Sequence, residues 1–241
     1  TGGIWTNQNV TLTPENETSN LGTTTYQYKV DGGEWQTYTA SIVISADTDA
    51  DGVTYTFKAT SASGVESDAV SITVKRDTVN PSGVAVSYGT SSFKEFLNNI
   101  SFGLFFKETQ PVTITATDTG SGVKEISYQL DNGELQTKTA DASGKITFNV
   151  EPQFVGNISG VTVMDNAGNG TSATAYEYFA VDNKTPDAPT VSTGSYTPDT
   201  WTYQVVTITV SGAEADSGIA KYQYSTDNGA SWQDMTASET T

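Results

Sequence analysis

The stretch ISYQLDNGELQTKT, residues 126–139, decides the fold because it predicts a β-hairpin that recurs along the chain. Apolar and polar residues alternate through ISYQL, an Asp-Asn-Gly turn follows, and a second strand opens with Leu and Gln. The pattern returns as YQYKVDGGEWQTYT at 26–39 and as YQYSTDNGASWQDMT at 222–236. Three hairpins of one kind indicate three copies of one structural repeat.

The segments around the hairpin also repeat. WTNQNVTLT precedes the first hairpin and WTYQVVTIT the third, while TYTFKATSASGVES follows the first and SGVTVMDNAGNGTS the second. A period of about 100 residues matches one β-sandwich domain per repeat. We therefore predict copy one at 1–76, copy two at 77–181 and copy three at 182–241. Copy one lacks a first strand and copy three its last strands, so we expect an excerpt of a longer protein.

Copy two shows the strand pattern most clearly. Val112, Ile114 and Ala116 alternate with threonines, which is typical of a strand with one face on a core. Two such sheets packed face to face form a sandwich. One stretch differs, since an S-x-x-E capping box at 92–95 opens FKEFLNNI with apolar residues at helical spacing. The predicted fold is all-β, with tandem immunoglobulin-like β-sandwich domains and a short helix in this loop of copy two.

The composition excludes several classes of function. The chain has 11 basic and 28 acidic residues, a formal charge of −17, which disfavours nucleic acid and anionic membranes as partners. It contains neither Cys nor His, so it lacks thiolate chemistry and the commonest general base. No hydrophobic run long enough to span a bilayer, phosphate-binding loop or nucleophile elbow is present. We therefore predict no enzyme activity, no cofactor and no membrane insertion.

An acidic loop at 46–55, ADTDADGVTY, is the calcium candidate of the sequence. Asp47, Asp49 and Asp51 have the D-x-D-x-D-G spacing with which a calcium loop begins. The twelfth position of such a loop needs a bidentate Glu, and Lys58 stands there. A polar turn explains the same residues without a metal, and it is the interpretation that we favour.

Three aromatic residues of copy three are the candidates for ligand contact. Trp201, Tyr203 and Trp232 could form a platform on which sugars stack if they share an exposed face. Because Trp5 matches Trp201 in copy one and Leu135 matches Trp232 in copy two, packing is the interpretation that we favour. Trp232 also ends an Asp-box pattern, STDNGASW, which we interpret as a structural turn.

Several of these segments resemble bacterial immunoglobulin-like repeats. The resemblance lies in VTITATDTGSGVKEISYQLDNGE, VTVMDNAGN and the linker DNKTPDAPT, and it covers most of the chain. Such repeats occur in cell-wall-anchored and secreted proteins of Gram-positive bacteria. The resemblance implies a non-catalytic stalk or spacer of an extracellular adhesin-like protein, next to other domains of a longer chain. The alternative is a module that binds glycans or host matrix proteins, or that accompanies a secreted glycoside hydrolase.

Overall fold

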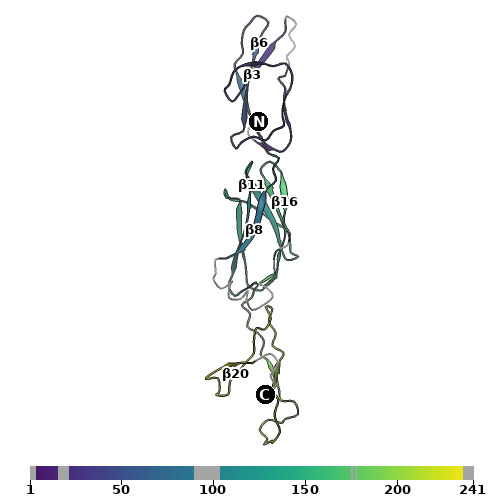
Figure 1. The fold of residues 1–241 in the computed structure, drawn as a ribbon, viewed down its shortest axis with the longest axis vertical. Helices are drawn as coiled ribbons and strands as arrows, with labels where there is room; N and C mark the ends of the chain where they lie inside the picture. Colours follow the sequence, from purple (N-terminus) through teal and green to yellow (C-terminus); the bar gives the residue numbers. More distant parts are fainter. Residues whose placement is uncertain (1–3, 16–21, 90–103, 175, 177, 236–241) are drawn as a thin grey trace. The chain divides into compact units, whose positions relative to one another are not determined.

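The computed structural model describes residues 4–15, 22–89, 104–174, 176 and 178–235. All regular elements in these ranges are β-strands, so the predicted all-β class is confirmed (Figure 1). The helix predicted near 92–100 lies outside the described residues. No helix among the described residues has the length and hydropathy to cross a membrane.

The chain divides into two units, which are described separately. The first contains residues 1–89, 112–148 and 158–176, and the second contains residues 90–111, 149–157 and 177–241. The first unit holds copy one and most of copy two, so the domain boundaries at 76 and 181 remain predictions.

Copy one is built from two sheets in the first unit. Its strands in the described residues are β1 (Trp5–Thr6), β2 (Val10–Leu12), β3 (Thr25–Val30), β4 (Gln36–Thr37), β5 (Ile42–Ile44), β6 (Val53–Thr60) and β7 (Val70–Arg76). The larger sheet has the order β1-β7-β6-β3-β4, and β2 pairs with β5. Leu12, Ile44 and Val74 form the buried core between them, with Tyr55 and Phe57 packed against it.

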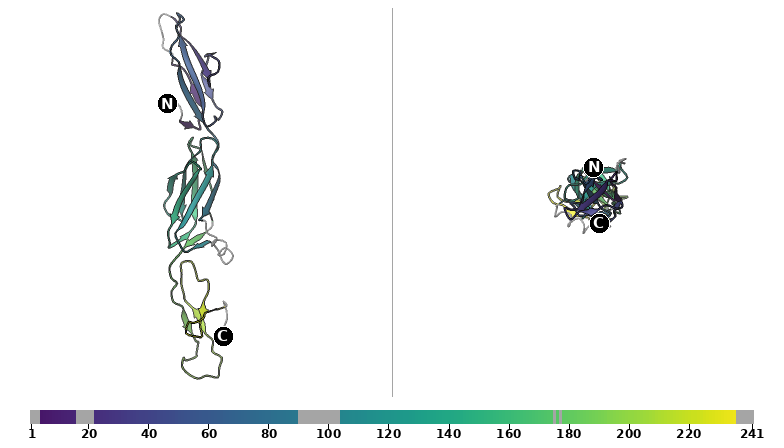
Figure 2. Two further views of the ribbon diagram at one scale, coloured as in Figure 1. Left: turned by 90° about the vertical axis from the view of Figure 1, so that its left-hand side faces the viewer. Right: turned by 90° about the horizontal axis from the view of Figure 1, so that it is seen from above.

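Copy two contributes two further sheets to the first unit. Their strands are β8 (Ser82–Tyr88), β10 (Gln110–Thr117), β11 (Val123–Leu130), β12 (Gln136–Thr139), β13 (Lys145–Val150), β15 (Ile158–Asp165) and β16 (Gly170–Ser172). The orders are β13-β10-β8 and β12-β11-β15-β16, and Figure 2 shows these strands running alongside one another. The Tyr128 ring on β11 stacks on the Phe148 ring on β13, with centroids 4.0 Å apart, so the two sheets share a core.

The predicted alternation in copy two is confirmed. Val112, Ile114 and Ala116 are at most 1% exposed, whereas Thr113 and Thr115 between them are only partly buried. On β15, Val161 and Val163 are likewise buried while Thr162 and Met164 are exposed. This is the pattern of strands with one face on a core.

Among its described residues, the second unit has three small sheets. Strands β9 (Leu104–Phe106), β14 (Phe154–Gly156) and β17 (Phe179–Val181) form the order β14-β17-β9. The Phe179 ring lies 6.4 Å from the Phe106 ring and 4.9 Å from the Phe154 ring. Copy three adds two strand pairs, β18 (Thr190–Ser192) with β19 (Thr209–Ser211) and β20 (Gln223–Tyr224) with β21 (Gln233–Asp234).

The three hairpins that decided the fold are present in the same register. The first-strand tyrosine pairs with the second-strand glutamine in each copy: Tyr28 with Gln36, Tyr128 with Gln136 and Tyr224 with Gln233. Turn residues Asp31 and Asp131 have φ of 46° and 52°, a conformation that short polar side chains tolerate.

The Asp-box turn of copy three is held by Asp227. Its Oδ1 accepts hydrogen bonds from the Ser231 amide (2.9 Å) and the Ser225 hydroxyl (2.7 Å), and its Oδ2 accepts one from the Ser231 hydroxyl (2.6 Å). The contacts are all local, which supports the structural interpretation.

We expect Asp227 to titrate well below an ordinary aspartate. The Ser231 and Ser225 hydroxyls, together with the Ser231 amide, lower the pKa of Asp227 to about 2. Because the folded pKa is lowered, the stabilisation is present above the ordinary value of about 3.8 and is lost as the pH falls through about 2. Carboxyl-carbon NMR should show this midpoint, and Ser231→Ala should raise it. An unchanged midpoint in S231A would contradict the assignment.

Candidate metal centre

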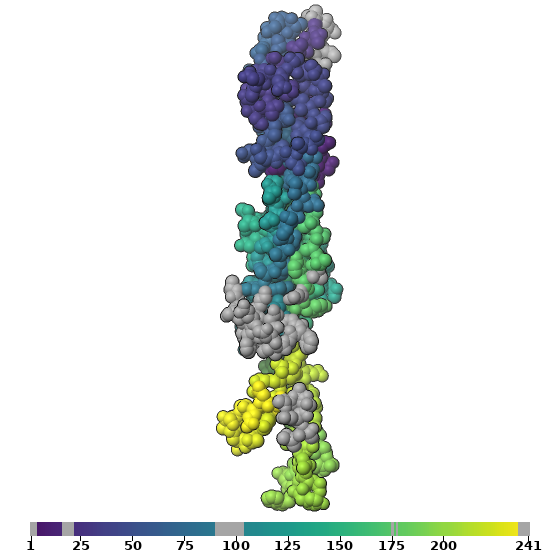
Figure 3. Space-filling view, viewed as in Figure 1, coloured from purple at the N-terminus to yellow at the C-terminus, as the bar shows by residue number. Residues whose placement is uncertain are grey.

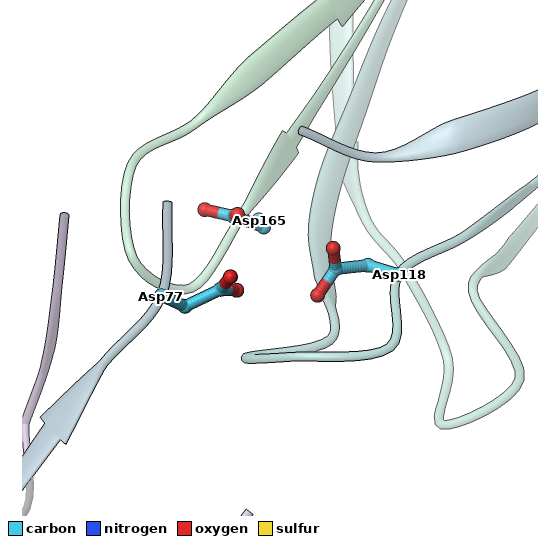
Figure 4. Close-up of side chains that lie close together, drawn as sticks. All are labelled: Asp77, Asp118 and Asp165. Carbon is cyan, nitrogen blue, oxygen red and sulfur yellow. The ribbon is translucent and has the colours of Figure 1, made fainter. Parts of the chain in front are cut away.

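Three aspartates from distant segments of the first unit converge on one point. Asp77 follows β7, Asp118 follows β10 and Asp165 ends β15. Each offers a carboxylate oxygen, and the three oxygens lie within 4.8 Å of one another. Figure 4 shows the carboxylates turned toward a common centre. No other group of three acidic residues in the described ranges is gathered in this way.

Asp77 is fixed by the backbone on both sides of the linker that joins copies one and two. Its amide donates to the Thr6 carbonyl (3.0 Å) in copy one. Its carboxylate accepts hydrogen bonds from the Val79 amide to Oδ1 (3.0 Å) and from the Ser121 amide to Oδ2 (2.7 Å). The side chain therefore points into the site without a freely rotating χ1.

The loop after β10 brings Asp118 against Asp77. The Gly122 amide donates to Asp118 Oδ2 (2.6 Å), which closes the loop. Gly120 lies in this loop directly on the Asp77 carboxylate, and a Cβ at this position would collide with the Asp77 carboxylate carbon and both oxygens. Only glycine leaves room for the carboxylate there, so the loop is shaped around the acidic group.

Asn169 positions Asp165 and links it to Asp77. The backbone N–H of Asn169 donates to Asp165 Oδ1 (2.8 Å). The side-chain Nδ2 of Asn169 donates both to Asp165 Oδ2 (2.7 Å) and to the Asp77 carbonyl (2.9 Å). Asn169 is itself 8% exposed. One buried amide side chain thus ties the end of β15 to the linker.

The electrostatics of the cluster are unfavourable without a cation. Asp77 is 1% exposed and Asp165 0% exposed, and Asp118 Oδ1 is buried with no hydrogen-bond partner. In the described part of the chain, no lysine or arginine forms an ion pair with any of the three. A buried charged group normally has a partner of opposite charge or a metal ion, because its desolvation without one costs roughly several kcal/mol.

The pKa values express the same imbalance. Burial raises the pKa of Asp118 above its ordinary value, and the charges of Asp77 and Asp165 raise it further. Burial acts on Asp77 in the same direction, but the amides of Val79 and Ser121 outweigh it and hold the pKa of Asp77 below its ordinary value. Asp77 is thus kept ionised while Asp118 is the group that resists ionisation.

The donor set fits a hard divalent cation. Carboxylate oxygens are the ligands of Ca²⁺, which takes them at about 2.3–2.6 Å. Two oxygens on opposite sides of such an ion are separated by about 5 Å, so the spacing of 4.8 Å or less suits it. Asp118 Oδ1, which has no hydrogen-bond partner among the described residues, is the atom that a cation would satisfy.

The sequence-predicted calcium loop has a different arrangement. Asp47 Oδ1 accepts from Arg76 Nη1 at 2.7 Å, and its carboxylate also accepts the Thr78 hydroxyl. Asp49 Oδ1 accepts the amides of Asp51 and Gly52 at 3.1 and 2.9 Å. These are the contacts of a polar turn, and within the described residues Asp47, Asp49 and Asp51 do not gather as the three site aspartates do.

The aromatic candidates of copy three are exposed. The relative exposures of Trp201, Tyr203 and Trp232 are 104%, 96% and 61%. Trp201 and Tyr203 lie in a stretch without strand structure, and Trp232 lies over Gly229 at the tip of its hairpin. Exposure alone does not distinguish a binding platform from core residues that lack a cover.

The sequence pattern alone did not reveal the cluster of Asp77, Asp118 and Asp165. The linker aspartate, the ATDTGSGV loop and the VMDNAGN turn were treated as repeat features. Copy one supplies the contrast, because Ser61 and Val65 make the two backbone-amide hydrogen bonds that Asp165 and Asn169 also make in copy two. Asp165 in copy two stands where copy one has Ser61, and this replacement of a hydroxyl by a carboxylate was the signal for the acidic cluster that the sequence offered.

Comparison with known proteins places the chain only by general likeness. No protein-family model matches the chain, and no curated protein matches it. Among solved structures, fibronectin(III)-like modules of Clostridium thermocellum CbhA align at 15% identity and a TM-score of 0.32, covering 74% of this chain and 88% of theirs. A Ca²⁺-stabilized adhesin of an Antarctic bacterium that binds ice aligns at 22% identity and a TM-score of 0.31.

The adhesin alignment covers 80% of this chain but only 49% of the adhesin, so the chain spans about half of that structure. Alignments with TM-scores this low establish no function for this chain.

Proposed function

We propose that the chain is a non-catalytic structural module of an extracellular, adhesin-like bacterial protein, in which a divalent cation of the calcium class stabilises the first unit. The observation that carries the proposal is the cluster of Asp77, Asp118 and Asp165, in which Asp77 and Asp165 are buried and the carboxylates face one another without a basic partner among the described residues. Such a cluster is costly unless a cation occupies it.

The position of the cluster indicates a structural role. Asp77 belongs to the linker after copy one, whereas Asp118 and Asp165 belong to opposite sheets of copy two. A cation held by all three joins the linker to both sheets. It therefore stabilises the folded arrangement, because the unfolded chain does not hold the three groups together.

The extracellular location is part of the same proposal. Calcium sites of extracellular modules have dissociation constants of about 0.1–1 mM, in keeping with abundant calcium outside cells. The absence of Cys and the charge of −17 are compatible with a secreted or surface protein but do not select one. Support for the location comes from the resemblance of the repeats and from this site.

Calorimetric titration of the chelator-treated full chain with CaCl₂ tests the proposal. We expect one saturable site per chain with a dissociation constant of about 0.1 mM, and its loss in Asp165→Asn. Glu134→Gln removes the same formal charge at an exposed hairpin position and should bind as the wild type does. No saturable heat in the wild type, or equal binding by D165N, would overturn the metal site.

A ligand-binding module for glycans or matrix proteins is the second candidate. It is favoured by the exposed Trp201, Tyr203 and Trp232. A saturable signal on a glycan or matrix-protein array that is lost in Trp201→Ala or Trp232→Ala would support it.

A further inference from the structure

Asp47, the first aspartate of the acidic loop in copy one, binds the residues on both sides of Asp77. Its Oδ1 accepts a hydrogen bond from Arg76 Nη1 at 2.7 Å. The Thr78 hydroxyl donates to the same carboxylate, at 3.1 Å from Oδ1 and 2.9 Å from Oδ2. One carboxylate of copy one therefore contacts the residue before and the residue after an aspartate of the cation site.

These two contacts determine the side of the chain on which the Asp77 carboxylate lies. In an extended segment, consecutive side chains point to opposite sides, and residues two apart share one side. Arg76 and Thr78 both reach Asp47. Asp77 lies between them in the chain and points the other way, toward the other two aspartates of the cluster (Figure 4). Asp47 thus helps to set the direction of a carboxylate that it does not touch.

The main chain around Asp77 is bound to copy one as well. Strand β1 pairs in parallel with β7, with Thr6 opposite Arg76, and the Asp77 amide continues this ladder by donating to the Thr6 carbonyl (3.0 Å). Figure 3 shows the purple atoms from the start of the chain beside the blue atoms around residue 75, as this pairing requires. The Thr48 amide donates to the Arg76 carbonyl (2.9 Å), and the Thr48 hydroxyl accepts the Arg76 amide (3.1 Å). Copy one therefore holds the backbone that carries Asp77.

The ion pair between Asp47 and Arg76 is partly shielded from water. The side chain of Arg76 is 10% exposed and that of Asp47 is 36% exposed. Salt screens such a pair less than it screens an exposed one, and removal of one partner leaves the other charge poorly solvated. Without the Asp47 carboxylate, Arg76 would lose the contact that holds its side chain in place, and the linker would be released on this side.

We propose that Asp47 is a positioning residue of the cation site: by holding the two neighbours of Asp77, it directs this carboxylate toward the cation. Copy one thereby sets part of the affinity of a site whose other ligands, Asp118 and Asp165, lie in copy two. The inference rests on the proposed cation site and adds to it a residue that does not contact the cation. Substitution of residues that orient metal ligands commonly lowers metal affinity by about 10–100-fold.

Calorimetric titration of the chelator-treated full chain with CaCl₂ tests the role of Asp47. We expect Asp47→Asn to weaken calcium binding about tenfold, because the asparagine lacks the charge that holds Arg76. Asp51→Asn is the matched control, since it removes the same formal charge from an exposed position of the same loop. It should bind calcium as the wild type does.

Substitutions of Thr78 separate positioning from charge. Thr78→Val removes the hydroxyl that donates to Asp47 without changing any charge, at an exposed position where the fold tolerates the change. It should weaken calcium binding about fivefold, the effect of one lost hydrogen bond to a charged group. Thr78→Ser keeps the hydroxyl and should restore the affinity of the wild type.

The outcomes distinguish the positioning role from the cation site itself. Weaker binding by D47N and T78V, with D51N and T78S at the affinity of the wild type, supports the positioning role. Wild-type affinity in T78V would overturn it and leave the cation site standing, because a loss in D47N alone is then an effect of charge or of local unfolding. If D47N does not fold, the pair T78V and T78S decides. No saturable binding by the wild type would overturn the cation site and this inference together.

Discussion

Calcium at about 10 mM will raise the midpoint of thermal unfolding of copy two by about 10–20 °C relative to chelator-treated protein. A ligand that binds only the folded state at about one hundred times its dissociation constant stabilises that state by about 2.7 kcal/mol. In a domain of about 100 residues, each kcal/mol moves the midpoint by about 4–8 °C. The three aspartates come together only in the folded chain, so the full effect is expected.

Differential scanning calorimetry in EDTA and in CaCl₂ measures this shift. A chain with a charge of −17 also gains stability from ordinary salt, because screening weakens its self-repulsion. NaCl at about 30 mM, which matches the ionic strength of the calcium buffer, is therefore the control. Asp165→Asn should show only the NaCl-sized shift. Equal midpoints of the wild type in CaCl₂ and in NaCl would contradict a structural cation.

The strands were predictable because their signal is local. The alternation through Val112, Ile114 and Ala116 places every second residue on one face, and the structure buries all three. The hairpins were equally predictable from local sequence, since a turn such as Asp31-Gly32 between alternating strands allows few registers of strand pairing. The chain's own repetition then extended one well-defined hairpin to three.

The aspartate cluster was not predictable in the same way because its residues meet only after folding. Asp77, Asp118 and Asp165 each follow or end a strand, where a lone aspartate is an ordinary turn residue. Their convergence depends on which strand ends share one end of the sandwich, and that is tertiary information. Once strands are assigned, aspartates at the ends of several strands of one copy are the feature to examine.

The acidic loop near Asp47 illustrates the opposite case. Its spacing imitates a calcium loop within six residues, so it is conspicuous in the sequence. Arg76, which lies 2.7 Å from Asp47 in the structure, is far from it in the chain. Local spacing therefore drew attention to one acidic group, and distance along the sequence concealed the other.

The substitution Asp118→Asn should raise the midpoint of thermal unfolding without calcium and lower it with calcium, each relative to the wild type in the same buffer. In chelator, the carboxylate of Asp118 is a liability, because burial and the charges of Asp77 and Asp165 raise its pKa and disfavour the ionised form. Asparagine removes that charge and can still accept the Gly122 amide through its side-chain oxygen. We expect the calcium-free variant to unfold about 2–5 °C above the calcium-free wild type.

In calcium the order reverses. Among the described residues, Asp118 Oδ1 is a buried oxygen without a hydrogen-bond partner, so in the wild type it is free to bind the cation as an anionic ligand. Asparagine offers only a neutral oxygen at this position. Because ligand charge tunes calcium affinity, D118N should lose most of the calcium-dependent rise of about 10–20 °C. Glu134→Gln, with the same change in formal charge, should follow the wild type in both buffers.

The reversal separates a metal ligand from a merely structural residue. A residue that only supports the fold through its hydrogen bond to Gly122 would lower the melting midpoint on substitution in both buffers alike. The linkage supplies a further check. Since the pKa of Asp118 is raised in the folded state, the calcium-free wild type should lose stability as the pH rises from about 3.8 through the raised pKa, and D118N should not show that loss. Destabilisation of D118N in EDTA as well as in calcium would rule out the electrostatic account of this site.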